Sequence, residues 1–184
     1  MKTIRNSVFE TNSSSMHSFN ISNKTPAITQ YNNLQLFICA DGEYGWGPGT
    51  VGSPGEKLDY AIVAMLILCE DRTEEDEADA NQKQVIRFAK GEKLKKQVKE
   101  YYDNIIDTFA KHGVLVEFDE KLYEIDPDTR WSIRLNYSGY IDHQSDPRDD
   151  GDCYKIAKWA MEDPESLFNY CFNDSYIELD NDNH

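Results

Sequence analysis

The clearest structural signal in this chain is Ser53-Pro-Gly-Glu-Lys-Leu-Asp-Tyr-Ala-Ile-Val-Ala-Met-Leu-Ile-Leu-Cys69. Ser53 suits a helix N-cap, Pro54 suits the first turn, and Glu56 stands where a capping box needs an acid. Apolar residues then recur at helical spacing, at Leu58, Ala61, Ile62, Met65, Leu66 and Cys69. The stretch therefore predicts a central helix over 54–69 whose apolar positions are buried.

The residues after this helix predict further helices and strands. Residues 82–112 indicate one broken helix or two consecutive helices, interrupted at Gly91 and stopped at Gly113. Three β-like runs follow, and we expect them to be antiparallel strands at 114–118, 122–125 and 131–137. The last expected elements are two short helices and a strand, at 152–161, 163–172 and 176–179.

The residues before the helix are extended and then rich in glycine. Residues 1–40 contain short β-like runs, and 41–55 hold six of the ten glycines, which predicts a loop. Helices and strands come in blocks, so the fold class is α+β. We expect a single domain over 1–184 with an antiparallel sheet packed by several helices. We also expect a mobile acidic loop near 70–80, where seven acids fall in eleven residues, and a polar C-terminal end.

The net charge of the chain limits the classes of partner that it can bind. The 184 residues include 19 Lys and Arg against 34 Asp and Glu, a net charge of −15. This charge opposes non-specific binding to nucleic acid and favours a basic protein partner, or a local basic patch. Seven of the 19 positive charges lie between Lys83 and Lys99. Lys95 and Lys96 in this strip are candidates for binding phosphate, and the alternative is an internal partner for the acidic stretch.

The chain shows no sign of a membrane or secretory protein. No apolar run is long enough to span a bilayer, and the N-terminus lacks the apolar core of a signal peptide. The four cysteines form no CxxC pair, so neither a zinc ribbon nor a redox motif is indicated. We expect a soluble, intracellular protein with reduced thiols.

The first motif that could support chemistry is a run of serines before a histidine. Asn12, Ser13, Ser14 and Ser15 offer groups that can bind a phosphate or a ribose, and His17 titrates near neutrality and could act as an acid or base. The structural alternative is a hydrogen-bonded polar turn with a surface histidine.

The second and third motifs lie further along the chain. Glycines flank Glu43, Tyr44 and Trp46, so the backbone could approach a ligand there while the Trp46 indole stacks on it. The alternative is a surface loop held by one buried tryptophan. Adjacent Asp142 and His143 could hold a metal or position a proton donor, although neighbours in a strand point to opposite faces.

These motifs together carry a family resemblance. The opening Val8-Phe9-Glu10-Thr11-Asn12-Ser13-Ser14-Ser15-Met16-His17-Ser18 resembles a family of phage and mobile-element proteins that begin V-F-E-T-N-S-S-S-x-H-S. Proteins of this family tend to carry G-E-[FY]-G-W, a K-L-x-Y step and G-Y-x-D-H-[QE]-S. The corresponding segments here are Gly42 to Trp46, Lys57 to Tyr60 and Gly139 to Ser145.

The opening, the size and the acidity are also similar to type II anti-CRISPR proteins, which inhibit an RNA-guided DNA nuclease. The resemblance implies partners: the effector nuclease and its guide RNA, in the cytoplasm of a bacterial host. It also implies an activity, inhibition through truncation of the guide RNA. In that interpretation His17 and His143 are the general acid and base, and Asp142 or Glu43 orients a histidine or holds a metal. Asn12 to Ser15, Tyr44, Trp46, Lys95 and Lys96 would bind the substrate.

Two other functions stay open. A non-enzymatic mimic of nucleic acid would use the acidic residues to block a basic groove of the effector. A phage enzyme acting on a nucleotide or on a host protein is the third. The sequence requires no cofactor, and it leaves a divalent metal and a homo-oligomer open.

Overall fold

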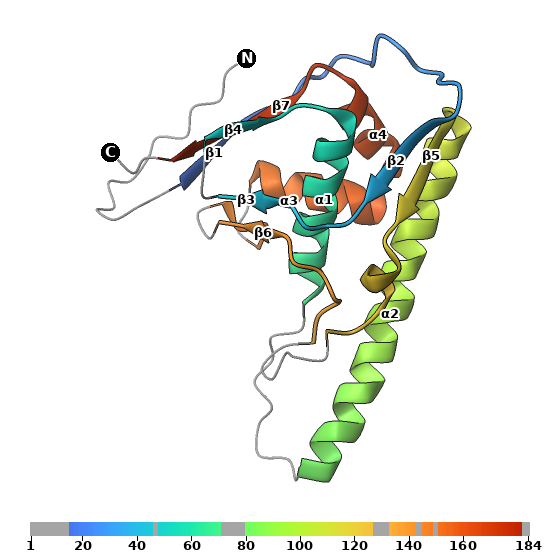
Figure 1. Cartoon of the computed structure of the whole chain (residues 1–184), viewed down its shortest axis with the longest axis vertical. Coiled ribbons are helices and arrows are strands. Elements are labelled where there is room, and N and C mark those ends of the chain that lie inside the picture. The colour runs from blue at the N-terminus through green and yellow to red at the C-terminus, as the bar shows by residue number, and fades with distance from the viewer. Residues whose placement is uncertain are drawn as a thin grey trace.

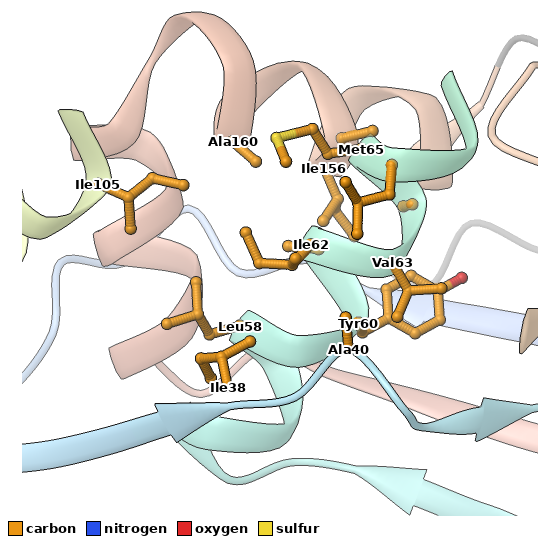
Figure 2. Packing of buried hydrophobic residues seen from close by; sticks show 14 of the residues in the cluster. Ile38, Ala40, Leu58, Tyr60, Ile62, Val63, Met65, Ile105, Ile156 and Ala160 are labelled. Carbon is orange, nitrogen blue, oxygen red and sulfur yellow. The ribbon is translucent and has the colours of Figure 1, made fainter. Parts of the chain in front are cut away.

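Helix α1 (Pro54–Cys69) lies at the centre of the fold, as the capping signal predicts (Figure 1). The computed structural model describes residues 15–45, 48–70, 80–126, 133–142, 145–148 and 151–181. Both bonds of the capping box are present: Glu56 N donates to Ser53 Oγ at 3.3 Å, and Ser53 N donates to the Glu56 carboxylate at 3.0 Å. The predicted apolar positions Leu58, Ile62 and Met65 are buried among residues of α3, α2 and the strand region (Figure 2). The prediction of a central structural helix is confirmed, except that Cys69 at its end is only partly buried.

The largest sheet pairs the first described strand of the chain with the last one. Strand β7 (Tyr176–Asn181) lies between β1 (Ser15–Asn20) and β4 (Gly49–Val51), and both pairings are antiparallel. The register places His17 opposite Leu179. This antiparallel sheet, packed against helices, confirms the α+β class.

Two smaller sheets correct the expected strand pairing. Strand β5 (Val114–Phe118) forms where the sequence predicts it, but it pairs in parallel with β2 (Leu34–Ile38). Strand β3 (Glu43–Tyr44) likewise pairs in parallel with β6 (Tyr140–Ile141). The prediction of antiparallel pairing for 114–118 is therefore wrong. Local patterns do not encode a partner strand that lies about eighty residues away.

The expected strand at 122–125 is also wrong. A single turn of 3-10 helix, η1 (Glu120–Tyr123), occupies the first half of this segment. Asp119 caps this turn, because its carboxylate accepts a hydrogen bond from Lys121 N at 3.0 Å. Within 122–125, only Ile125 forms a β-bridge, and its partner is Leu135. Leu135 belongs to the expected strand at 131–137, whose residues 131 and 132 lie outside the described residues.

Helix α2 (Ala80–Lys111) is one continuous helix, so Gly91 does not interrupt it. A Cβ atom at Gly91 would lie 3.3 Å from Ile125 Cγ1, and the glycine therefore lets Ile125 pack against the helix. Phe88 and Ala89 are exposed rather than buried. Among residues 88–111 of α2, for which burial is described, the buried positions are Gly91, Leu94, Val98, Tyr102, Ile105 and Phe109.

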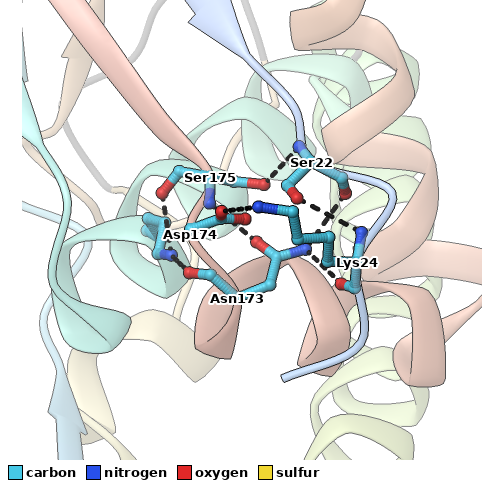
Figure 3. A network of polar contacts seen from close by, with 6 residues as sticks. Ser22, Lys24, Asn173, Asp174 and Ser175 are labelled. Carbon is cyan, nitrogen blue, oxygen red and sulfur yellow. Dashed lines mark hydrogen bonds and ion pairs between the residues drawn. The ribbon is translucent and has the colours of Figure 1, made fainter. Parts of the chain in front are cut away.

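Two short helices complete the core, α3 (Asp152–Glu162) and α4 (Pro164–Phe172), and both were predicted. A network of polar contacts fixes the turn after α4 to the chain that follows β1 (Figure 3). Ser22 N donates to Ser175 Oγ at 2.9 Å, and Asn173 Nδ2 donates to the carbonyls of Ser22 and Lys24. None of the helices within the described ranges has both the length and the apolar character needed to cross a membrane.

Candidate functional site

The second and third sequence motifs are joined directly by strand pairing. Glu43 lies opposite Tyr140 and Tyr44 opposite Ile141 in the β3–β6 pair. The pairing extends one residue further, since Asp142 N donates to the Tyr44 carbonyl at 3.0 Å. Gly45 makes this close approach feasible, because a Cβ atom there would lie 2.8 Å from Asp142 Cβ.

The first motif reaches the same place through His17 in β1. His17 Nδ1 forms a hydrogen bond of 3.0 Å with Tyr60 Oη of α1. The Tyr60 ring makes edge contacts with the His17 ring, at 5.8 Å between centroids, and with the Tyr44 ring, at 4.8 Å. We call His17, Tyr44, Asp59, Tyr60 and Asp142 the motif cluster.

His17 is buried and electrically neutral in this cluster. Its side chain is 7% exposed, and Nε2 finds no hydrogen-bond partner within the described part of the chain. Burial lowers the pKa of the imidazole to about 4, although the Asp142 charge and the Tyr44 carbonyl act in the opposite direction. At pH 7 the ring therefore carries no charge.

Two hydroxyl groups extend the motif cluster into the core. Tyr60 Oη donates to Cys153 Sγ of α3 at 3.3 Å. Tyr44 Oη donates to the Asp59 carboxylate at 2.9 Å, and that carboxylate also accepts from Ala40 N at 2.8 Å. Burial raises the pKa of Asp59 despite these hydrogen bonds, and it raises the pKa of the Tyr44 hydroxyl still more strongly.

Sequence reasoning missed both Asp59 and Lys57. The Lys57 ammonium is fully buried and donates to the carbonyls of Asn173, at 2.9 Å, and Ser175, at 3.0 Å, between α4 and β7. Burial lowers the pKa of Lys57. The K-L-x-Y step thus joins α1 to three different parts of the fold through Lys57, Asp59 and Tyr60. The signal was available, because polar residues inside an otherwise apolar helix need buried partners.

The other predicted site residues do not join the motif cluster. Glu43 is exposed, because it alternates with the buried Tyr44 along β3. Lys95 forms ion pairs with Glu92 and Glu124, at 3.4 and 3.5 Å. Lys96 is exposed on α2, which packs against β5 and α4 on another side of the fold (Figure 1).

Six of the predicted site residues have side chains that the structure does not describe. Asn12, Ser13, Ser14, Trp46 and His143 lie outside the described residues. For Ser15 only the backbone is described, opposite Asn181 in the β1–β7 pair.

The motif cluster has the chemistry of a buried structural network. Across the described ranges, no three His, Cys, Asp or Glu residues are grouped so that they could hold a metal ion. Its hydroxyl, carboxyl and backbone groups are mostly bonded to one another. Such a network fixes how β1, β3, α1 and α3 pack together.

Comparison with known proteins adds no relative. No family model, no curated protein and no solved structure matches this chain.

Proposed function

We propose that this chain is an acidic binding protein that inhibits a type II RNA-guided nuclease by occupying its basic nucleic-acid groove. The observation that carries the proposal is the environment of His17, the residue with the strongest sequence claim to catalysis. Its ring is 7% exposed, hydrogen-bonded to Tyr60 and neutral at pH 7. A general acid or base must reach the proton that it transfers, and burial to this degree opposes such access.

In this proposal, the negative net charge of the chain attracts it to the positively charged groove of the nuclease. With 34 acidic against 19 basic residues, the chain is attracted to positively charged surfaces and repelled by phosphates. The groove of an RNA-guided nuclease is positively charged, because it holds a heteroduplex by its backbone. The choice of this partner rests on the resemblance of the opening sequence to phage and mobile-element proteins.

Guide-RNA truncation is the second candidate. It is favoured by one observation, that the described parts of all three motifs meet around His17, Tyr44 and Asp142. Glu43, which is exposed on β3, would then be an acid of these motifs that solvent and substrate can reach.

One experiment separates the two candidates. Nuclease loaded with guide RNA is incubated with the protein at rising salt, and DNA cleavage, complex formation and RNA length are measured together. The acidic inhibitor is expected to leave the RNA intact and to lose affinity as salt screens the charges. Shortened RNA would favour truncation. A chain that neither binds nor inhibits the loaded nuclease would overturn the proposal.

A further inference from the structure

The outer face of the β2–β5 sheet exposes two large apolar side chains beside two polar ones, and no described element covers those apolar side chains. On the inner face, α1 packs against β2 and α2 packs against β5. Alternate residues point outward, and among them Phe37 is 61% exposed and Leu115 is 47% exposed. We call Gln35, Phe37, Leu115 and Glu117 the outer sheet face.

This exposure is unusual for the kind of sheet involved. Parallel strands in folded proteins are nearly always covered on both faces. Here the two strands pair only with each other within the described ranges, so each also has an outer edge with no strand beside it. Apolar side chains gathered on such a surface are typical of an interaction site.

The one charged residue of the outer sheet face, Glu117, indicates what kind of partner binds there. The register places Phe37 opposite Glu117 and Gln35 opposite Leu115, so an exposed carboxylate lies within the apolar patch. A second copy that docks on this face, about a twofold axis through it, would place two Glu117 carboxylates in the same interface, which costs free energy. Nucleic acid is repelled by the net charge of −15. A partner segment with both apolar and cationic side chains could cover Phe37 and Leu115 and also pair with the Glu117 carboxylate.

We propose that the outer sheet face binds an extended, basic segment of a partner protein, in which apolar residues alternate with arginine or lysine. The apolar side chains would cover Phe37 and Leu115, and a cation would pair with Glu117. The outer edges of β2 and β5, which pair with no other strand within the described ranges, offer backbone groups to an extended chain. The inference deepens the proposed function and rests on it in one respect, that the partner is basic.

The test uses a short peptide of alternating arginine and valine, titrated into the isotope-labelled full chain and followed by NMR. A peptide of alternating glutamate and valine is the control for charge. The expected result is saturable shifts at the amides of 34–38 and 114–118 with the basic peptide only. Shifts confined to other acidic surfaces would overturn the proposal.

Matched variants sharpen the result. Phe37→Ser and Glu117→Lys are each expected to weaken peptide binding about tenfold, as removal of a central contact does. Two controls carry the same changes on α2: Phe88→Ser, at a residue 72% exposed, and Glu100→Lys, at an exposed acid. Equal loss in test and control variants, or no loss in either, would contradict the assignment.

The outcome is distinct from that of the proposed function, because no nuclease is present. If the chain inhibits the nuclease but does not bind the peptide at this face, the peptide-binding proposal is overturned and the proposed function stands. If the chain binds the peptide here but does not inhibit the nuclease, the peptide-binding face is supported and the proposed function is overturned.

Discussion

The hydroxyl of Tyr60 is the point at which the motif cluster can be cut with least change in shape. Tyr60→Phe keeps the ring contacts with His17 and Tyr44, at 5.8 and 4.8 Å. It removes the partner of His17 Nδ1 and the donor to Cys153 Sγ. The His17 ring would then be buried with neither nitrogen bonded to a described residue. Leaving a buried polar group without its partner costs about 1–3 kcal/mol, so we expect the free energy of unfolding to fall by that amount.

A double-mutant cycle tests the cause of the loss. His17→Leu alone removes the imidazole, and the pair His17→Leu with Tyr60→Phe removes both partners of the hydrogen bond. Because two apolar groups leave no unsatisfied imidazole, the double variant should be more stable than the sum of the single losses predicts. Urea unfolding followed by tyrosine and tryptophan fluorescence measures all four proteins. Strict additivity, or a Tyr60→Phe variant as stable as the wild type, would show that the hydrogen bond between His17 and Tyr60 does not stabilise the fold.

Three further predictions concern pH and the core. Since the pKa of folded His17 is about 4 and that of an unfolded histidine is about 6.5, the unfolded chain binds the proton more readily. As the pH falls from about 6.5 to about 4, protonation of the unfolded chain at His17 therefore lowers the free energy of unfolding by about 3 kcal/mol, and above about pH 6.5 this loss is absent. Urea unfolding across this range should show a smaller pH dependence in the His17→Leu variant than in the wild type. Met65→Ala, at a fully buried position, should destabilise the fold by about 2–5 kcal/mol, and an unchanged melting temperature would contradict its place in the core. Lys57→Met leaves the carbonyls of Asn173 and Ser175 without their donor, so we expect a loss of about 1–3 kcal/mol in urea unfolding, whereas the control Lys96→Met on exposed α2 should cost far less.

The sequence predicted those parts of the fold that depend on neighbouring residues. Helix α1 follows from its capping box and the spacing of its apolar residues, and α4 follows from Asp163, whose carboxylate accepts a hydrogen bond from Ser166 N. The parallel pairing of β2 with β5 could not be predicted in this way, because it joins segments that are remote in the chain. The turn η1 was missed because Asp119 caps it locally, in competition with the strand.

The candidate site shows the same division. The motifs were recognisable as segments, and the structure brings their described parts together, but their chemistry depends on burial. Strand alternation places His17 on the same face as Phe19, and this was the available signal that the histidine lies toward the core. The partners Tyr60 and Asp59 come from α1, so only the packed structure brings them to His17 and Tyr44.

In the proposed function, His17 supports the fold and does not cut RNA. The most direct measurement compares the wild type with His17→Leu, after both are shown to be folded, for guide-RNA length and nuclease inhibition in the same reaction. We expect intact RNA with both proteins and nuclease inhibition by both. RNA that the wild type shortens and the folded His17→Leu variant leaves intact would contradict it, since removal of a catalytic acid or base slows a reaction by about 10²–10⁴-fold.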